Sequence, residues 1–155
     1  QNNQSTQNNQ PTYDNTDAFD TPVSTTESEG EMSEFEINSS GIVTGYYGSS
    51  NYVMLPSKIQ GKTVVGIGDN CFKGSKIISI QIPETVKSIG NSAFQECKSL
   101  TNVIFANQNV DVTIGKAAFK HCEKLKNINL PVTSSIGASA FEGCTALLEH
   151  IKETL

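Results

Sequence analysis

Arginine is absent from this chain of 155 residues, and all eleven of its basic residues are lysines. Arginine is the side chain best suited to bidentate contacts with phosphates and base edges, so its absence argues against nucleic-acid recognition. The sequence also contains no apolar run near the roughly 18 residues that a membrane-spanning helix needs. We therefore expect neither a nucleic-acid partner nor direct insertion into a membrane.

Signatures of catalysis and of metal binding are missing as well. The sequence has no CxxC pair, no Gly-x-Ser-x-Gly motif and no His-Glu-x-x-His motif. The Gly-Ile-Gly segment at 66–68 begins like a dinucleotide-binding loop, but Cys71 stands where that loop needs its third glycine. The two histidines, His121 and His150, have no partner motif. These absences predict a protein that is not an enzyme and that holds no metal or cofactor.

Charge is divided unevenly along the chain. Residues 1–36 carry eight acids and no lysine, whereas residues 37–155 carry eleven lysines and eight acids, so a segment of charge −8 precedes a body of charge +3. A body with so small an excess of lysine does not indicate nucleic-acid binding on electrostatic grounds.

The segment 1–33 is almost entirely polar or acidic and contains almost nothing to bury. Such a segment cannot offset its ordering entropy, and we predict that 1–33 is a flexible acidic and polar linker. An acidic strap that folds back on the lysines of the body is the alternative. Because the chain starts at Gln1, with no signal peptide, we expect a mature or trimmed form of an exported protein that the linker tethers to a cell surface.

An internal repeat dominates the rest of the sequence. In four copies an Ile-Gly pair is followed by a phenylalanine at the fifth position after the isoleucine, and the copies follow one another at an interval that is constant except for one slightly longer step. The repeated residues are Ile67, Ile89, Ile114 and Ile136, and Phe72, Phe94, Phe119 and Phe141. Between copies, segments such as 78–83 and 127–131 alternate apolar and polar residues, which predicts short strands with one buried face.

A unit of this length with one strand cannot bury its own apolar face, but stacked units can. We predict a single curved stack of about four coils with one short parallel strand per coil, and with equivalent side chains about 4.8 Å apart along the stack. The recurring glycine marks a turn that has no room for a Cβ, and the segment after it looks like a short helical turn. The extra residues 107–113 should bulge at a loop without breaking the stack.

The four cysteines follow the repeat. Cys97, Cys122 and Cys144 each stand at the third position after the repeat phenylalanine, and Cys71 stands where the other copies have alanine. We interpret them as small, reduced, buried fillers. A disulfide between adjacent coils, whose Cα atoms would lie within range, is an alternative, and the spacing gives little support to a zinc site.

One copy shows a family resemblance clearly. Ile80-Gln-Ile-Pro83, Val86, Ile89-Gly90, Ala93-Phe94, Cys97 and Leu100 resemble the BspA-like, Treponema-type leucine-rich repeats of bacterial surface proteins, and the resemblance covers residues 35–148. It implies an α/β repeat solenoid, a leucine-rich-repeat stack with a parallel strand face, short helical turns and an N-terminal β cap. The implied domain is 34–155, with a cap at 34–66, repeats over about 67–148 and a C-terminal lid at 149–155.

The resemblance also implies a function. We expect a non-catalytic, adhesin-like binding module, monomeric, secreted or anchored on a bacterial cell surface (a lipoprotein anchor is one form), with a protein or glycan as partner. A structural spacer, or an accessory repeat domain of a larger surface protein or enzyme, is the alternative. An exposed apolar or aromatic patch on the strand face would favour binding, and a uniformly polar face would favour a spacer.

In leucine-rich repeats the strand face is the concave surface, and the resemblance implies that binding occurs there. The outward strand positions in this sequence are Ser79, Gln81, Asn102, Ile104, Asn127 and Asn129. Their amide groups both donate and accept hydrogen bonds, which suits peptides and glycans. Five lysines are expected on the opposite, helical-turn side as a solvated face: Lys73, Lys98, Lys116, Lys120 and Lys124.

Overall fold

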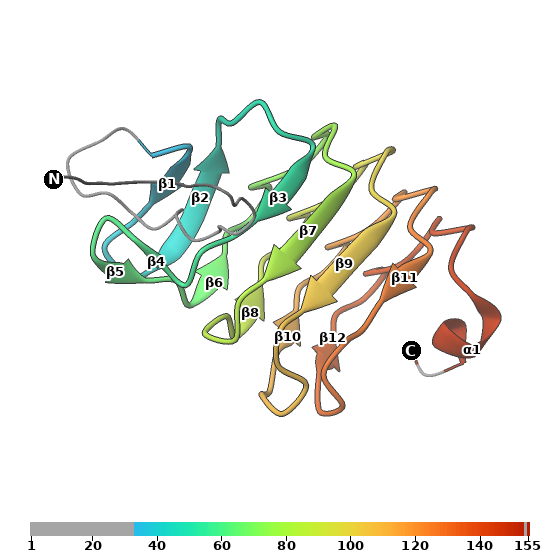
Figure 1. Cartoon of the computed structure of the whole chain (residues 1–155). Helices are drawn as coiled ribbons and strands as arrows, with labels where there is room; N and C mark the ends of the chain where they lie inside the picture. The colour runs from blue at the N-terminus through green and yellow to red at the C-terminus, as the bar shows by residue number, and fades with distance from the viewer. Residues whose placement is uncertain (1–32, 154) are drawn as a thin grey trace, which may run out of the picture.

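Two kinds of short strand alternate along the chain, and each kind stacks on its own kind to form a solenoid (Figure 1). The structure is a computed structural model that describes residues 33–153 and 155. The predicted linker therefore lies outside the described residues apart from Ser33.

One sheet has six strands in the order β1 (Phe35–Ile37), β2 (Ile42–Tyr46), β6 (Gly66–Ile67), β8 (Ser88–Ile89), β10 (Thr113–Ile114) and β12 (Ser135–Ile136). A second sheet has four strands in the order β11 (Asn127–Ile128), β9 (Asn102–Phe105), β7 (Ser79–Ile82) and β3 (Tyr52–Met54). Neighbouring strands are parallel except for the antiparallel pair β1–β2. A separate hairpin joins β4 (Lys58–Ile59) to β5 (Lys62–Thr63).

Each coil thus contributes two parallel strands, and the prediction of one strand per coil is wrong. The second strand ends at the isoleucine of the Ile-Gly pair, and in it Ile89 pairs with Ile67 on one side and with Ile114 on the other. This strand is very short, so it contains no alternation that a sequence pattern could display. The pairing continues from β8 to β10 to β12 across the insertion at 107–113, so that insertion leaves the stack intact, as predicted.

The segments around the repeat phenylalanine are turns rather than helices, so the prediction of a short helical turn after each Ile-Gly pair is wrong. In every copy the residues two before and two after the phenylalanine have left-handed φ angles of 57–79°. They are Asn70, Gly74, Ser92, Glu96, Ala117, His121, Ser139 and Gly143. Alternate N–H groups consequently leave the turn and reach the next coil, as where Phe72 N donates to Ala93 O at 2.7 Å. An α-helix would direct all of these N–H groups back into itself.

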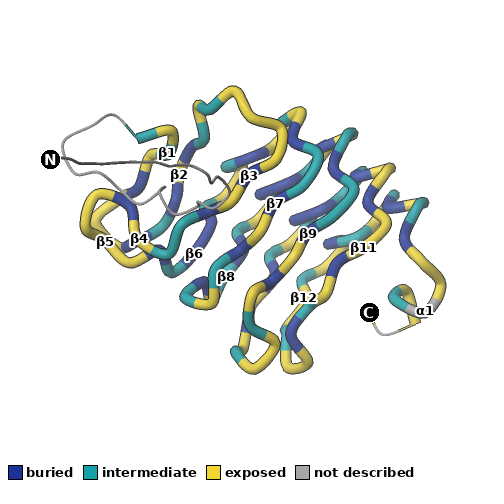
Figure 2. The backbone as a smooth tube through the Cα atoms, in the orientation of Figure 1, coloured by how far each residue is buried: buried dark blue, intermediate teal, exposed yellow. Residues whose placement is uncertain are grey.

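The core runs along the stack as ladders of identical side chains. Phe72, Phe94 and Phe119 are buried, and successive ring centroids lie 5.0 Å apart with planes inclined by only 2°. The buried stripes recur in register from coil to coil (Figure 2). The predicted core is confirmed for these three coils. In the last coil Ile136 is 38% exposed and Phe141 is half-buried, because no further coil lies over them in the described chain.

The glycine of each Ile-Gly pair is required by close packing between coils. A Cβ on Gly115 would lie 2.7 Å from the backbone nitrogen of Asn91 and 2.7 Å from the carbonyl carbon of Gly90. The φ angle of Gly115 is not left-handed, so its backbone is one that other residues adopt. The prediction that no Cβ fits here is confirmed, but the reason is contact with the preceding coil rather than a special turn.

The two ends differ from the repeats. At the N-terminal end, Phe35 of β1 packs its ring against Tyr46 of β2 at 5.1 Å, and Tyr46 packs against Phe72 at 5.7 Å. At the C-terminal end the chain forms the short helix α1 (Glu149–Lys152). Ile151 of α1 packs against the core, whereas Leu155 remains 40% exposed.

Candidate functional site

The outward face of the four-stranded sheet, here called the strand face, carries five of the six residues predicted to bind, and the sixth, Asn129, follows directly after the strand β11. Strand register places Ser79 beside Asn102 and Gln81 beside Ile104. Asn127 extends the first row, because it pairs with Asn102. Gln81, Ile104, Asn127 and Asn129 are exposed, and Ser79 and Asn102 are half-buried.

Two further exposed residues stand at the start of these rows, on β3, and the sequence analysis did not predict them. Tyr52 pairs with Ser79 and Met54 pairs with Gln81, and their side chains are 67% and 53% exposed. A signal was present in the sequence, since Val53-Met-Leu-Pro56 has the apolar-x-apolar-Pro pattern of the later strands. The face therefore begins one coil earlier than predicted, with an aromatic and a thioether side chain.

Several of the predicted asparagines are engaged within the protein. Asn129 Oδ1 accepts a hydrogen bond from Phe105 N at 2.7 Å, and Asn129 Nδ2 donates to Phe105 O at 3.1 Å. The side chain of Asn129 thus replaces the strand pairing that ends at Ile128. Asn127 Nδ2 donates to Asn102 Oδ1 at 3.1 Å. Gln81 has no side-chain hydrogen bond within the described part of the chain, so it offers the freest amide on this face.

The five lysines expected to lie away from the strand face all lie in turns and not in strands. Two of them form exposed ion pairs with the adjacent coil: Lys98 with Glu123 at 3.8 Å, and Lys120 with Glu142 at 3.7 Å. Exposed pairs of this kind contribute little stability. These lysines form a solvated side, as expected.

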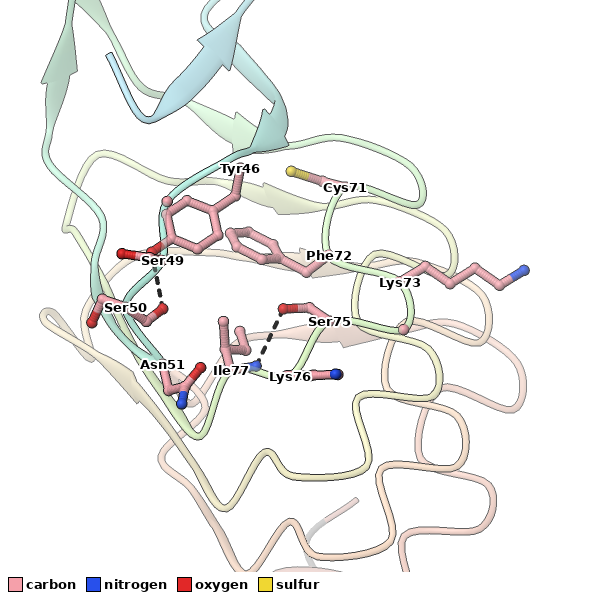
Figure 3. A pocket seen from close by; sticks show the side chains of 12 residues that line it. Tyr46, Ser49, Ser50, Asn51, Cys71, Phe72, Lys73, Ser75, Lys76 and Ile77 are labelled. Carbon is pink, nitrogen blue, oxygen red and sulfur yellow. Dashed lines mark hydrogen bonds between the residues drawn. The ribbon is translucent and has the colours of Figure 1, made fainter. Parts of the chain in front are cut away.

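A cleft of about 470 Å³ lies at the N-terminal end (Figure 3). Its walls are the β2–β3 connection at 48–51 and the first turn at 71–77, and the rings of Tyr46 and Phe72 form part of its lining. Tyr46 Oη donates to Ser50 O at 3.0 Å, and Ser75 Oγ accepts from Ile77 N at 3.2 Å. The sequence reasoning did not anticipate this cleft, because it forms between segments with no shared motif.

The cysteine ladder is a structural element. The thiols of Cys97, Cys122 and Cys144 donate to the carbonyl of the repeat phenylalanine one coil earlier, at 2.9–3.0 Å. Burial raises the pKa of Cys71 to about 12, with a further contribution from Glu36. The hydrogen bond with Cys144 lowers the pKa of Cys122, whereas the hydrogen bond with Cys97 and burial raise it. The net pKa of Cys122 is about 12. Thiols with such pKa values are poor nucleophiles.

Within the described residues, no three His, Cys, Asp or Glu side chains are grouped to hold a metal ion. In the same part of the chain, no helix has the length and apolar character needed to cross a membrane.

Comparison with known proteins identifies the repeat. The family described as "BspA type Leucine rich repeat region (6 copies)" matches residues 29–152. The chain belongs to the BspA-type leucine-rich repeat family. In this member of the BspA-type family the repeat has three structural counterparts: the two parallel strands of each coil, the phenylalanine ladder and the cysteine ladder. None of the curated proteins matches the chain.

Solved structures of bacterial leucine-rich repeat proteins resemble this BspA-type chain. A leucine-rich cell surface protein of Faecalibacterium prausnitzii is 30% identical, with a TM-score of 0.64 over 73% of this chain and 33% of its own length. A leucine-rich repeat protein of Bacteroides capillosus is 31% identical, with a TM-score of 0.63 over 73% of this chain and 88% of its own. The T. pallidum leucine-rich repeat protein shares the fold at 24% identity and a TM-score of 0.57, over 79% of this chain and 69% of its own. The chain thus spans about a third of the F. prausnitzii protein.

Proposed function

We propose that this chain is a non-catalytic, adhesin-like binding module that recognises a protein or a glycan through its strand face. The observation that carries the proposal is a set of exposed apolar side chains, Tyr52, Met54 and Ile104, arranged around the unpaired amide of Gln81. A single exposed apolar residue is ordinary, but Met54 and Ile104 flank Gln81 in one row across β3, β7 and β9, and Tyr52 stands two residues before Met54 on β3. Tyr52, Met54 and Ile104 are called the apolar patch. A tyrosine presents an apolar ring with a polar tip, which suits both peptides and sugars.

The same patch distinguishes binding from the spacer alternative. A spacer needs only a polar, solvated strand face, and exposed apolar groups there would promote unwanted association. An accessory role beside a catalytic domain would leave the same face available for a macromolecule. A solenoid offers an extended surface, which also favours a macromolecular partner over a small enclosed substrate.

The proposal includes display on a bacterial surface, with the β1–β2 hairpin acting as a cap for the first coil. The first part is supported by the similar F. prausnitzii protein, which is described as a leucine-rich cell surface protein. The second is supported by Phe35, whose ring packs on Tyr46 at the N-terminal end of the aromatic ladder. Protease treatment of intact source cells tests the location: loss of the protein from whole cells supports display, and full protection contradicts it.

The binding role is tested with a glycan array and a panel of purified extracellular-matrix proteins. The test variant is Tyr52→Ser/Met54→Ser/Ile104→Ser, which removes the apolar patch. The matched control is Val132→Ser/Leu148→Ser, which removes exposed apolar side chains in the last coil and beside α1, at 85% and 42% exposure. We expect a ligand of the wild type to lose at least about ten-fold in affinity for the test variant and to be unchanged for the control. Equal affinity for both variants would contradict the strand face as the site.

A further inference from the structure

The turns of successive coils are joined by a ladder of backbone hydrogen bonds that has a direction. At each of three junctions, three N–H groups of one turn donate to three carbonyls of the next turn, with N–O distances of 2.7–3.0 Å. In the second coil the accepting carbonyls belong to Asn91, Ala93 and Gln95. The carbonyls at these positions therefore point toward the preceding coil at every junction.

The first turn has the same carbonyls, but no N–H group of the described residues donates to them. One repeat before Asn91, Ala93 and Gln95, the equivalent positions are occupied by Asp69, Cys71 and Lys73. The chain before them passes from β2 to β3 through residues 48–51 without forming a turn, so no described residue occupies the donor position. Among the described residues, no hydrogen bond reaches these three carbonyls. Cys71 and Lys73 line the cleft, which is the space that a preceding turn would fill (Figure 3).

Ser75 adds a donor to the same cleft. In the later coils this position is a cysteine whose thiol donates to the phenylalanine carbonyl one coil earlier. Ser75 has no such carbonyl before it, and its Oγ instead accepts from Ile77 N. Within the described part of the chain, the Ser75 hydroxyl donates no hydrogen bond. The cleft thus presents carbonyl acceptors and a hydroxyl donor, which together match the two polar groups of a peptide bond.

Charge around the cleft is divided. Lys73 and Lys76 line it on the side of the first turn, and neither forms an ion pair within the described residues. Glu34 and Glu36 lie on the side of the β1–β2 hairpin. The Glu34 carboxylate helps to raise the pKa of Tyr46 after the larger effect of burial, and the Glu36 carboxylate helps to raise the pKa of Cys71 after burial. An acidic side chain on a ligand is therefore attracted toward the first turn and repelled from the hairpin.

We propose that this cleft binds an extended acidic peptide segment of a partner protein. Alternate backbone N–H groups of the peptide donate to the carbonyls of Cys71 and Lys73, as Phe72 and Gly74 donate to the second coil, and acidic side chains contact Lys73 and Lys76. The site is separate from the strand face, and its test has no bearing on the function proposed above.

The test uses the full chain and a fluorescein-labelled decapeptide of alternating aspartate and serine, followed by fluorescence anisotropy. A copy with all backbone nitrogens methylated keeps the charge and removes the donors. Ser49→Trp fills the cleft from an exposed position, and Ser40→Trp is the matched control in the β1–β2 connection. Lys73→Gln/Lys76→Gln removes the charges, with Lys124→Gln/Lys126→Gln as its control. Backbone carbonyl ¹³C shifts of Cys71 and Lys73 report hydrogen bonding directly.

We expect the decapeptide to shift the Cys71 and Lys73 carbonyl resonances and to bind about ten-fold more weakly to Ser49→Trp, while Ser40→Trp is unchanged. The N-methylated peptide should bind the wild-type protein at least about ten-fold more weakly than the unmodified peptide, because its two hydrogen bonds to Cys71 and Lys73 are removed. Equal binding of the methylated copy, equal binding by Ser49→Trp, or no binding at millimolar peptide would overturn the proposal. Binding that begins only when the six acids of residues 1–32 are replaced by amides would also overturn it, because the chain's own segment would then be the occupant.

Discussion

Truncation of one ring in the aromatic ladder gives the most direct test of the stacking register. Phe94 is fully buried, and its ring lies 5.0 Å from Phe72 on one face and 5.0 Å from Phe119 on the other. Buried Phe→Ala changes cost about 3–5 kcal/mol, and aromatic pairs add about 0.5–1.5 kcal/mol beyond area burial. Because Phe94 has neighbours on both faces that cannot collapse into the space, we expect Phe94→Ala to lose about 4–5 kcal/mol.

The ladder supplies its own control. Phe141 occupies the same slot in the last coil, but it is half-buried and contacts one ring, Phe119 at 5.2 Å. Phe141→Ala should therefore cost about half as much or less, since less area is removed from contact. Urea unfolding followed by far-UV circular dichroism measures both losses. The register would be refuted if Phe94→Ala unfolded at the wild-type midpoint, or if Phe141→Ala were the more damaging change.

Contacts between coils support four further predictions. Gly115→Ala should destabilise by about 1–3 kcal/mol or more through overpacking against the preceding backbone, measured as a lower urea midpoint. The pKa values of Cys71 and Cys122 are raised to about 12 in the folded protein. The contribution of these thiols to stability should therefore be constant below about pH 8 and should fall as the pH rises from about 9 toward 12, because unfolded thiols lose protons there that folded thiols keep. At pH 8 a thiol reagent should label the native protein slowly and count four free groups after denaturation, and a native disulfide would lower that count. Asn129→Ala should cost about 1–3 kcal/mol by leaving the end of β9 unpaired, whereas Gln81→Ala should change stability by less than about 0.5 kcal/mol.

The repeat itself was readable from the sequence because stacked coils require the same side chain at the same place. The phenylalanine, cysteine and isoleucine positions keep the same offsets within the copies that have them, and the phenylalanine rings and the isoleucines proved to lie beside their counterparts in the next coil. The cysteine thiols proved to bond to the phenylalanine carbonyl of the preceding coil. The strands at 79–82 and 102–105 were also predictable, since along each of them one face is buried and the other exposed. The outward residues of the strand face follow from that alternation.

The turns and the second strand row were not readable in this way. The strand that ends at the isoleucine of each Ile-Gly pair is too short to show a pattern, and the turn after it contains left-handed residues as different as Ala117 and His121. Asparagine or glycine, the residues that favour this conformation, marks only three of these positions, 70, 74 and 143, because hydrogen bonds to the adjacent coil impose it on the others. The local sequence therefore suggested a helical turn, whereas hydrogen bonds between coils favour a turn with left-handed residues whose N–H groups reach the next coil.

The amino-acid sequence determined the repeat period, the buried ladders and most of the strand face, because these depend on which side chains recur along one chain. Tertiary structure alone decided the rest. Asn129 became a pairing group for β9 only because the two coils lie side by side, and the cleft beside Tyr46 exists only because the coil before the first turn has no turn of its own. Both are properties of contacts between segments that lie about one repeat apart along the chain, which no local pattern records.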